Sequence, residues 1–358
     1  MSHFHRLKIA DRTEETRDSV SLAFAVPSEL QERFRFRQGQ YLTLKANIND
    51  EEVRRSYSIC SGIHDNELRV AVKRVPDGLF SNFANDQLAV GDEIEVMEPM
   101  GHFYTELNKD RSGHYLLVAA GSGITPILSQ VKTLLRSEPK SHVTLIYGNR
   151  ATVSTMFKDQ LEDLKNSYMG RLNLIFIFSR EQQDIDLYNG HIDAEKCDVL
   201  FSKCINVASL TDVFICGPQA MTETVSEALI RAGMPKQQVH FELFGTVQDS
   251  SKKAQRTQAA ERATHLSNIE IIRDGHVKHF DLAQNTQNIL DAANDQGAEL
   301  PYSCKAGVCS TCKCKVVEGE VEMDVSIGLE DYEVKEGFVL SCQSYPVTDK
   351  VVLDFDQI

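Results

Sequence analysis

Hydrophobic and polar positions alternate in short runs over the first part of the chain. Five such runs are broken by Gly, Pro or polar turns, and a helical stretch follows Leu79: Val20–Val26, Tyr41–Ala46, Ser56–Cys60, Leu68–Val75 and Glu93–Met97. Because successive side chains of a strand point to opposite faces, this alternation predicts half-buried strands. We therefore expect residues 1–110 to form an antiparallel β-barrel.

The pattern changes after residue 110, where short apolar runs stand between helical segments. The runs are Tyr115–Ala119, Val143–Tyr147, Leu174–Phe178 and Val213–Cys216, and the helical segments are Ile127–Arg136, Phe157–Leu164 and Ala220–Ala232. Strands that are apolar on both faces are typical of a parallel sheet covered by helices. Residues 111–245 are therefore expected to form a nucleotide-binding α/β domain.

Residues 246–266 are polar and nearly free of large apolar side chains. Such a composition predicts a linker, and a linker would let the domain that follows it, residues 267–358, move between partners. That last segment has 7 Lys and Arg against 17 Asp and Glu, a net charge of −10. We expect it to dock on a basic surface of a protein partner.

The totals limit the class of protein. The chain has 358 residues, enough for two or three domains, and is 42% hydrophobic and 25% charged, as soluble proteins are. No apolar run approaches the ~18 residues of a membrane span, and the N-terminus lacks the apolar core of a signal peptide. Nine cysteines then favour a reducing compartment, so we expect a cytoplasmic protein. A net charge of −14 argues against nucleic acid as a partner.

Four cysteines near the C-terminus predict a metal site. Cys304, Cys309 and Cys312 have the spacing C-x4-C-x2-C, and Cys342 follows after a gap. This is the plant-type spacing of a 2Fe-2S cluster held by four thiolates. The alternative is a zinc site with four cysteine ligands, but such sites usually have two C-x2-C pairs and this chain has one. Cys314 stands in an alternating run and is expected to be a strand residue.

A glycine-rich turn follows the first strand of the α/β domain. In A-G-S-G-I-T-P, Gly121 and Gly123 permit a tight turn, and we expect Thr125 to cap a helix that begins at Pro126. The free N–H groups of that helix would face a diphosphate. The third glycine of the usual fingerprint is missing, so the motif is weak without its strand and helix.

The ends of the next strands favour NADPH over NADH. An NAD site usually has an acidic residue at the end of the second strand, where this chain has Arg150. The third strand ends in Ser179 and Arg180, and guanidinium and hydroxyl groups suit a 2′-phosphate. The fourth strand ends in C-G-P, where the small side chain of Cys216 would let a flat ring approach. Buried cysteines are common, however.

The barrel segment contains candidate flavin-binding residues. Arg55, Tyr57 and Ser58 open a strand-like run, where they suit a diphosphate, a ring system and a reactive ring nitrogen. Gly78 and Ser81 lie where a helix begins, which is a second place for an anion. Each signal is weak alone.

Taken in order, the motifs R-S-Y-S, G-L-F-S-N, G-S-G-I-T-P, C-G-P and F-E-L-F resemble the ferredoxin–NADP reductase superfamily. The C-terminal cysteine pattern is similar to members that carry a plant-type ferredoxin. Within these, L-P-Y-S-C-K-A-G-V-C-S-T-C and Y-G-N-R resemble the reductases of the phenylacetyl-CoA epoxidase (ring-1,2-epoxidase) systems.

This resemblance implies three cofactors: FAD in the barrel, NADPH in the α/β domain and a 2Fe-2S cluster in a C-terminal β-grasp ferredoxin domain. By family likeness, the flavin contacts Arg55, Tyr57 and Ser58, with Gly78 and Ser81 at its diphosphate. NADPH contacts Gly121 and Thr125, Cys216 flanks the nicotinamide, and Glu242 and Phe244 lie near the flavin ring. FAD rather than FMN rests on the resemblance alone.

We expect an enzyme that passes single electrons from NADPH, through flavin and cluster, to an oxygenase. Ser58, Cys216 and Glu242 are the candidate catalytic residues. Two alternatives stay open. The acceptor could instead belong to a Rieske-type aromatic oxygenase, a hybrid-cluster protein or a globin. More remotely, the chain could be a zinc-stabilised binding module fused to a nucleotide-sensing domain.

Overall fold

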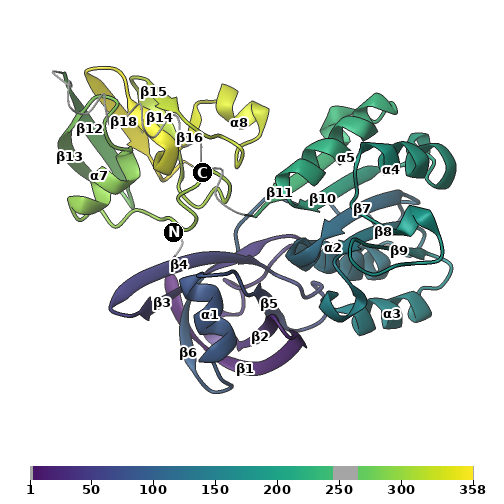
Figure 1. Ribbon diagram of the computed structural model, residues 1–358. Helices are drawn as coiled ribbons and strands as arrows, with labels where there is room; N and C mark the ends of the chain where they lie inside the picture. The colour runs from purple at the N-terminus through teal and green to yellow at the C-terminus, as the bar shows by residue number, and fades with distance from the viewer. Residues whose placement is uncertain (1–2, 245–264, 358) are drawn as a thin grey trace. The chain divides into compact units, whose positions relative to one another are not determined.

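The computed structural model describes residues 3–244 and 265–357 (Figure 1). These residues separate into two compact units, which divide the chain between Phe244 and Gly245. The first unit contains a barrel and a parallel sheet, and the second contains a smaller mixed sheet. Among the described residues, no helix is both long and apolar enough to span a membrane.

The barrel of the first unit is a six-stranded antiparallel sheet in the order β4-β3-β6-β1-β2-β5. Its strands are β1 (Phe4–Thr16), β2 (Ser19–Ala25), β3 (Tyr41–Ile48), β4 (Glu51–Ser58), β5 (Leu68–Lys73) and β6 (Glu93–Met97). A bridge between Ile59 and Val70 joins the two edges, so the sheet closes. Alternate side chains, among them Leu7, Ile9 and Leu22, fill its interior. The expected barrel is confirmed.

The sequence pattern missed β1 and placed β4 too late. Both strands are rich in charged residues, and only Leu7 and Ile9 of β1 and Val53 and Ser58 of β4 are buried. Backbone pairing with β2, β6 and β3 makes them strands, and such pairing has no hydrophobic signature. The helix expected after Leu79 is α1 (Leu79–Asp86), which packs Phe80 and Ala84 on the barrel core.

The parallel sheet of the first unit has the order β11-β10-β7-β8-β9. Its strands are β7 (His114–Ala120), β8 (His142–Asn149), β9 (Leu172–Phe178), β10 (Asp212–Gly217) and β11 (Val239–Leu243). Its helices are α2 (Ile124–Ser137), α3 (Lys158–Ser167), α4 (Ala194–Val199) and α5 (Gln219–Arg231). The structure confirms the expected α/β region, and adds β11 and α4, which the pattern did not predict.

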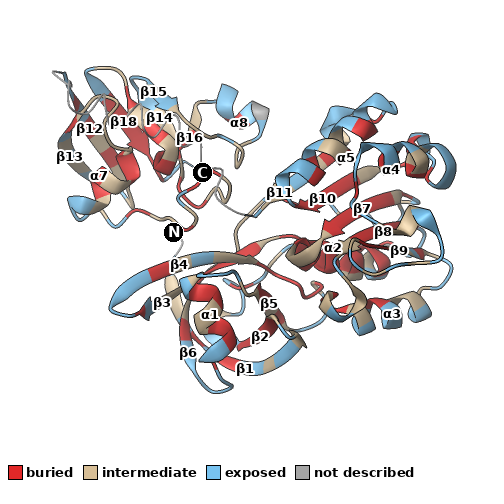
Figure 2. Cartoon of the chain, in the orientation of Figure 1, coloured by how far each residue is buried: buried red, intermediate tan, exposed pale blue. Residues whose placement is uncertain are grey.

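Alternation along each strand divides the apolar side chains between two layers of helices. Tyr115 and Leu117 of β7 pack with α2 and α3, whereas Leu116 and Val118 pack with α4 and α5. Figure 2 shows the strands of this sheet buried and the outer faces of the helices exposed. The central strands are therefore apolar on both faces, which is why their sequence was easy to recognise.

Contacts between the barrel and α2 hold the two halves of the first unit together. Ser129 donates a hydrogen bond of 2.6 Å to the carbonyl oxygen of Ser61, and Lys132 forms an ion pair of 2.9 Å with Asp65. Gln130 of α2 donates a hydrogen bond of 2.9 Å to the carbonyl oxygen of Phe103 in the barrel segment. Gly39 packs on the same carbonyl: its φ is +86°, and a Cβ there would lie 2.0 Å from that oxygen. Only glycine permits this approach.

The second unit has a five-stranded sheet in the order β13-β12-β18-β14-β16 and a two-stranded sheet, β15-β17. Its elements are β12 (Leu266–Arg273), β13 (His276–Ala283), α7 (Ile289–Asp295), β14 (Lys313–Glu318), β15 (Val321–Met323), α8 (Asp331–Lys335), β16 (Phe338–Leu340), β17 (Ser344–Pro346) and β18 (Lys350–Asp354). Strand β12 begins at Leu266, the last residue of the expected linker 246–266. Up to residue 264 that linker lies outside the described residues.

Candidate functional site

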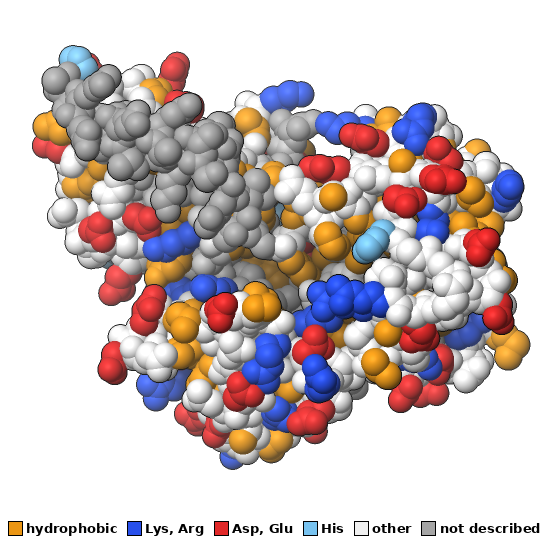
Figure 3. All heavy atoms as spheres, viewed as in Figure 1, with side chains coloured by type: hydrophobic (Ala, Val, Ile, Leu, Met, Phe, Trp, Pro, Cys, Tyr) orange, Lys and Arg blue, Asp and Glu red, His pale blue; other side chains and the backbone are white. Residues whose placement is uncertain are grey.

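A cleft of about 730 Å³ lies at the carboxyl ends of the parallel strands in the first unit. Its walls come from the residues after β7, β8, β9 and β10, with Lys73 of the barrel and Phe244 after β11. On the face drawn in Figure 3, Lys and Arg side chains gather where the barrel meets this sheet. A cleft at this edge is where open α/β sheets bind nucleotides.

The glycine-rich turn forms the floor of the cleft. Gly121–Gly123 is a short 3-10 turn, and Gly121 has a φ of +55°. A Cβ on Gly123 would lie 2.2 Å from the carbonyl oxygen of Cys216. The turn therefore packs directly on the end of β10, and its second glycine is required by space rather than by its dihedral angles.

The predicted helix cap was wrong. Helix α2 begins at Ile124 with Gly123 at the N-cap, because the 3-10 turn runs directly into the helix. Thr125 is therefore inside the first turn, where it is buried and donates a hydrogen bond of 3.0 Å to the carbonyl oxygen of Ser122. It does not line the cleft, so its placement supports a structural contact with the turn.

The strand ends bring two of the three predicted phosphate-binding residues to the cleft. Arg150, after β8, and Ser179, after β9, both line it. Arg180 is exposed and is not among the lining residues, but its backbone N–H donates to the carbonyl oxygen of Arg150 at 2.8 Å. The N–H of Ser179 likewise donates to the carbonyl oxygen of Asn149 at 2.9 Å.

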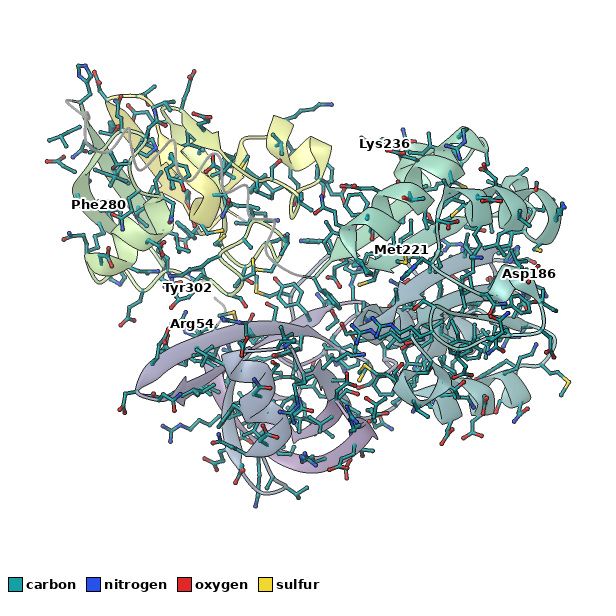
Figure 4. The ribbon with its side chains drawn as sticks, in the orientation of Figure 1. Arg54, Asp186, Met221, Lys236, Phe280 and Tyr302 are labelled. Carbon is teal, nitrogen blue, oxygen red and sulfur yellow. The ribbon has the colours of Figure 1, made fainter. Side chains whose placement is uncertain are left out.

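Sequence reasoning missed several residues of the cleft. They are Lys73, Asn149, Ser154, His191, Asp193, Met221 and Thr224. His191 reaches the cleft because Gly190 bonds the end of β9, and Met221, on α5 (Figure 4), packs against Gly217. Of these residues, Ser154 could have been predicted from the sequence, because it is a polar residue only four positions after the end of the recognised motif Y-G-N-R. Lys73 belongs to another sheet and carried none.

The three candidate catalytic residues lie together. Ser58 of the barrel is buried and donates a hydrogen bond of 3.1 Å to Glu242 Oε2. Glu242 is the direct neighbour of Cys216 in the pairing of β10 with β11. Burial raises the pKa of Glu242 to about 7, while the bond from Ser58 opposes this shift. Burial, with the nearby Glu242 charge, raises the pKa of Cys216 well above its ordinary value.

These residues differ in how far they can reach a ligand. The Cys216 side chain is fully buried and does not line the cleft. Phe244 lines it and is 43% exposed. A carboxyl group with a pKa near neutrality can either hold or release a proton at physiological pH, so Glu242 is chemically suited to a site that handles protons.

Three of the candidate flavin residues, Tyr57, Gly78 and Ser81, lie at the start of α1. Arg55 lies exposed on β4, and Tyr57 packs on Phe80 of α1 with ring centroids 5.5 Å apart. Gly78 is the N-cap of α1 and has no side chain to cap it. Ser81 does not replace that cap: it accepts the Val75 N–H at 3.1 Å and donates to the Gly78 carbonyl. The uncapped helix end and Arg55 fit a diphosphate.

In the second unit, the four predicted cysteines are arranged in two pairs. A hydrogen bond with Cys309 lowers the pKa of Cys304, and a bond with Cys342 raises that of Cys312. Cys312 also interacts electrostatically with Cys309, so the two pairs are neighbours. Two pairs of thiols fit a cluster of two irons, each of which takes two cysteine ligands.

The loop around these thiols turns N–H groups toward sulfur. The Ala306 N–H donates to Cys304 Sγ at 3.3 Å, and the Cys304 N–H to Cys309 Sγ at 3.5 Å. Lys305, Gly307 and Ser310 have φ between +52° and +75°, which makes these inward turns possible. Cys314 is a buried residue of β14 that contacts the Val339 carbonyl, as predicted for a strand residue.

Comparison with family models identifies three regions of the chain. An oxidoreductase FAD-binding domain matches residues 6–104, an oxidoreductase NAD-binding domain residues 117–227, and a 2Fe-2S iron-sulfur cluster binding domain residues 271–347. These matches confirm the expected cofactor classes. The third match also disfavours the zinc alternative for the four cysteines.

Known proteins resemble the chain over its whole length. It is 46% identical to a subunit of the 1,2-phenylacetyl-CoA epoxidase of Escherichia coli, over 99% of both chains. It is 34% identical to the ferredoxin reductase component of a 3-ketosteroid-9-alpha-monooxygenase of Rhodococcus rhodochrous, over 98% of this chain and 96% of that one. The structure of phthalate dioxygenase reductase matches 98% of both chains with 27% identity and a TM-score of 0.58.

We expect Glu242 to make stability depend on pH. Because its pKa is about 7 in the folded protein against 4.5 for an ordinary glutamate, the folded state binds the proton more tightly. Stability is then fully present below the ordinary pKa and falls as pH rises toward the folded one. Glu242→Gln should therefore gain thermal stability over the wild type between about pH 5 and about pH 8. Glu195→Gln, which changes an exposed glutamate, is the control and should show no such gain. If the thermal stability of Glu242→Gln depends on pH in the same way as that of the wild type, the raised pKa of Glu242 is contradicted.

Proposed function

The chain belongs to the family of reductase components that serve oxygenases, and on this premise we propose that it is the NADPH-dependent reductase of a phenylacetyl-CoA epoxidase. The observation that carries the proposal is the combination, within one chain, of a nucleotide cleft, a flavin-type barrel and two neighbouring pairs of thiols. Full-length similarity to one component of such an epoxidase supports the choice of acceptor.

The domains of the proposal keep the boundaries expected from the sequence. Residues 1–110 would bind FAD, residues 111–245 NADPH and residues 267–358 the cluster, with 246–266 as the linker. The bound flavin and cluster supply the redox chemistry, which converts a hydride into single electrons. The protein contributes binding, orientation and electrostatics. The proposed compartment is the cytoplasm, where the nine cysteines would stay reduced.

At the flavin, Arg55 and the N-terminus of α1 at Gly78 and Ser81 would hold the diphosphate. Tyr57, fixed against Phe80, would pack on the flavin. Ser58 stands at the boundary between barrel and sheet, where its bond to Glu242 orients both groups toward the same place. We assign to Glu242 the role of holding or releasing a proton there, with Cys216 as a compact support beneath the nicotinamide.

Positive charge at the strand ends supports NADPH rather than NADH. Arg150 and Ser179 line the cleft, and Arg180 follows at its border. Guanidinium and hydroxyl groups bind a phosphate well, whereas a ribose hydroxyl would need an acceptor at the same place. Gly121 and Gly123 would let the rest of the dinucleotide approach the backbone.

We place the docking surface for the oxygenase on the second unit, around α8. Tyr332 and Val334 are 58% and 42% exposed, and the exposed Glu330 and Glu336 flank them; we call these four residues the α8 patch. The exposed Lys335 at the end of α8 lies beside Glu336 and offsets part of the acidic charge. An apolar centre with an acidic rim suits a basic, partly apolar recess on the partner.

The α8 patch is connected to the cluster loop. Glu333, on the inner side of α8, is buried in an ion pair of 2.9 Å with Lys313, which directly follows Cys312. The Gly328 N–H, just before α8, donates to the Gly307 carbonyl at 2.8 Å, between Cys304 and Cys309. A partner on this patch would thus approach the cluster through a short, well-anchored path.

Removing one cluster ligand tests the proposed electron path. Cys309→Ser should lose the native cluster absorbance and the NADPH-driven reduction of the epoxidase oxygenase. It should keep NADPH-dependent reduction of ferricyanide, because the flavin and nucleotide sites lie in the other unit. Cys314→Ser, which changes a buried thiol outside the four, is the control. Failure of the wild type to reduce the oxygenase, while still reducing ferricyanide, would refute the proposed acceptor.

Arg150→Ala tests the nucleotide preference. Loss of a charge-assisted phosphate contact should raise KM for NADPH about 10- to 150-fold and leave KM for NADH nearly unchanged. Steady-state reduction of ferricyanide with each nucleotide measures both values. An equal change for the two nucleotides would remove Arg150 from the proposed role.

Tyr332→Ala tests the α8 patch. If the tyrosine is a central contact, the KM for the oxygenase should rise roughly tenfold or more. Stopped-flow reduction of the cluster by NADPH within the chain should not change. Val277→Ala is the matched control. Val277 is 52% exposed on β13, which is the edge strand opposite β16, and β16 is the strand that α8 contacts. Slower internal reduction, with unchanged transfer to the oxygenase, would assign the patch to the chain's own first unit.

A further inference from the structure

The segment between β8 and α3 forms one wall of the nucleotide cleft. It carries Arg150 and Ser154, both of which line the cleft: Arg150 precedes a single 3-10 turn, Thr152–Ser154, and Ser154 is the last residue of that turn. The turn closes on itself, because Ser154 accepts the Ala151 N–H at 3.2 Å and donates to the Ala151 carbonyl at 2.8 Å. Such a short turn has little packing of its own, since none of its three residues is buried.

Glu181, two residues after Ser179 at the end of β9, holds this turn from outside the cleft. Its Oε2 accepts the Thr152 N–H at 2.7 Å, and its Oε1 accepts the Thr152 hydroxyl at 2.6 Å. Both contacts are short enough to be charge-assisted hydrogen bonds. They lower the pKa of Glu181, as expected for a carboxylate that accepts bonds in its ionised form.

These bonds extend a ladder between the two strand ends. The N–H groups of Ser179 and Arg180 donate to the carbonyls of Asn149 and Arg150 at 2.9 and 2.8 Å. The two bonds of Glu181 to Thr152 continue the series by one more step. Backbone bonds thus hold the carbonyls of Asn149 and of Arg150 itself, and the carboxylate of Glu181 holds Thr152, two residues further on.

The charge of Glu181 is the opposite of what a phosphate site favours. A carboxylate beside a cleft that binds an anion repels the anion, so charge alone gives no reason for an acid here. Its two oxygens accept from the N–H group and hydroxyl of Thr152, and Oε1 also accepts from the Gln183 side-chain amide at 3.3 Å; all of these donors are neutral. Glu181 is therefore suited to orient the segment that carries Arg150, and not to bind the anion.

We infer that Glu181 is a positioning residue for NADPH binding. Its hydrogen bonds to Thr152 hold Arg150 and Ser154 so that they face the 2′-phosphate end of the nucleotide. This deepens the proposed NADPH preference and rests on it. Glu181 acts through Thr152 and does not itself contact the nucleotide. The selectivity for NADPH over NADH then depends on an acidic residue, although the charge of that residue by itself disfavours binding of the 2′-phosphate.

The sign of the effect tests the inference. In Glu181→Ala, the Kd of NADP⁺, measured by calorimetry on the flavin-loaded full-length protein, should rise roughly three- to tenfold. The Kd of NAD⁺ should change little. In steady-state assays KM for NADPH should rise while kcat stays close to the wild type. A residue that acted only through its charge would give the reverse result, because removing a negative charge would tighten the binding of NADP⁺.

Further variants distinguish a positioning role of Glu181 from an effect of its charge and from a loss of folding. Asp184→Ala removes an exposed acid from the same loop without touching Thr152, so it should not weaken NADP⁺ binding. Thr152→Val removes only the hydroxyl partner and should reproduce part of the loss in Glu181→Ala. In the double variant the two losses should not add, since both break one interaction. If Glu181→Ala does not fold, Thr152→Val and Glu181→Gln give the same readout.

The outcomes distinguish this inference from the proposed function. Unchanged or tighter NADP⁺ binding in Glu181→Ala, together with a selective loss in Arg150→Ala, overturns the positioning role and leaves the NADPH preference standing. If Arg150→Ala affects NADP⁺ and NAD⁺ equally, the preference itself fails, and the role of Glu181 fails with it. Full additivity in the double variant would also overturn the inference, because Glu181 would then act independently of Thr152.

Discussion

The packing of the barrel against α2 is the constraint on which the nucleotide and flavin sites depend. Hydride transfer requires two flat rings at van der Waals distance, and each half of the first unit can hold only one of them. The bonds from Ser129 to the Ser61 carbonyl and from Gln130 to the Phe103 carbonyl join the two halves. Cys60 and Ala71 of the barrel segment also pack into the buried core around α2. The bond between Ser58 and Glu242 crosses the same boundary at the proposed meeting place of the rings.

The second unit solves a different problem, since its site must hold a charged inorganic group in a small domain. Backbone N–H groups aimed at Cys304 and Cys309 can stabilise negative sulfur without any basic side chain. Because no basic side chains are needed around the sulfur atoms, the surface of this unit can be acidic. Residues 267–358 have a net charge of −10. The α8 patch, which we propose as the docking surface, would add apolar contacts to this charge. Charge speeds the encounter of two proteins, and apolar contact makes it specific.

Polar side chains outside the nucleotide cleft bind the segments that line it. Arg150 was evident from its place after an apolar strand, but the grip of Glu181 on Thr152 was not. Thr125 shows the reverse case: it stands in the recognised motif, yet the structure gives it a contact with Ser122 inside the first turn of α2. A motif therefore locates a site more reliably than it assigns the work of each of its residues.

By itself, the sequence determined the order of the barrel, the parallel sheet and the iron–sulfur domain, and it indicated the four cysteines that we propose as ligands of the cluster. These features follow from local periodicity and fixed spacing, which the chain carries wherever it folds. The charged strands β1 and β4, the N-cap of α2 and the cleft residues Lys73, His191 and Met221 were decided by tertiary structure. Their places depend on strand pairing and on contacts between segments far apart in sequence, and no local pattern records which backbone a residue will meet.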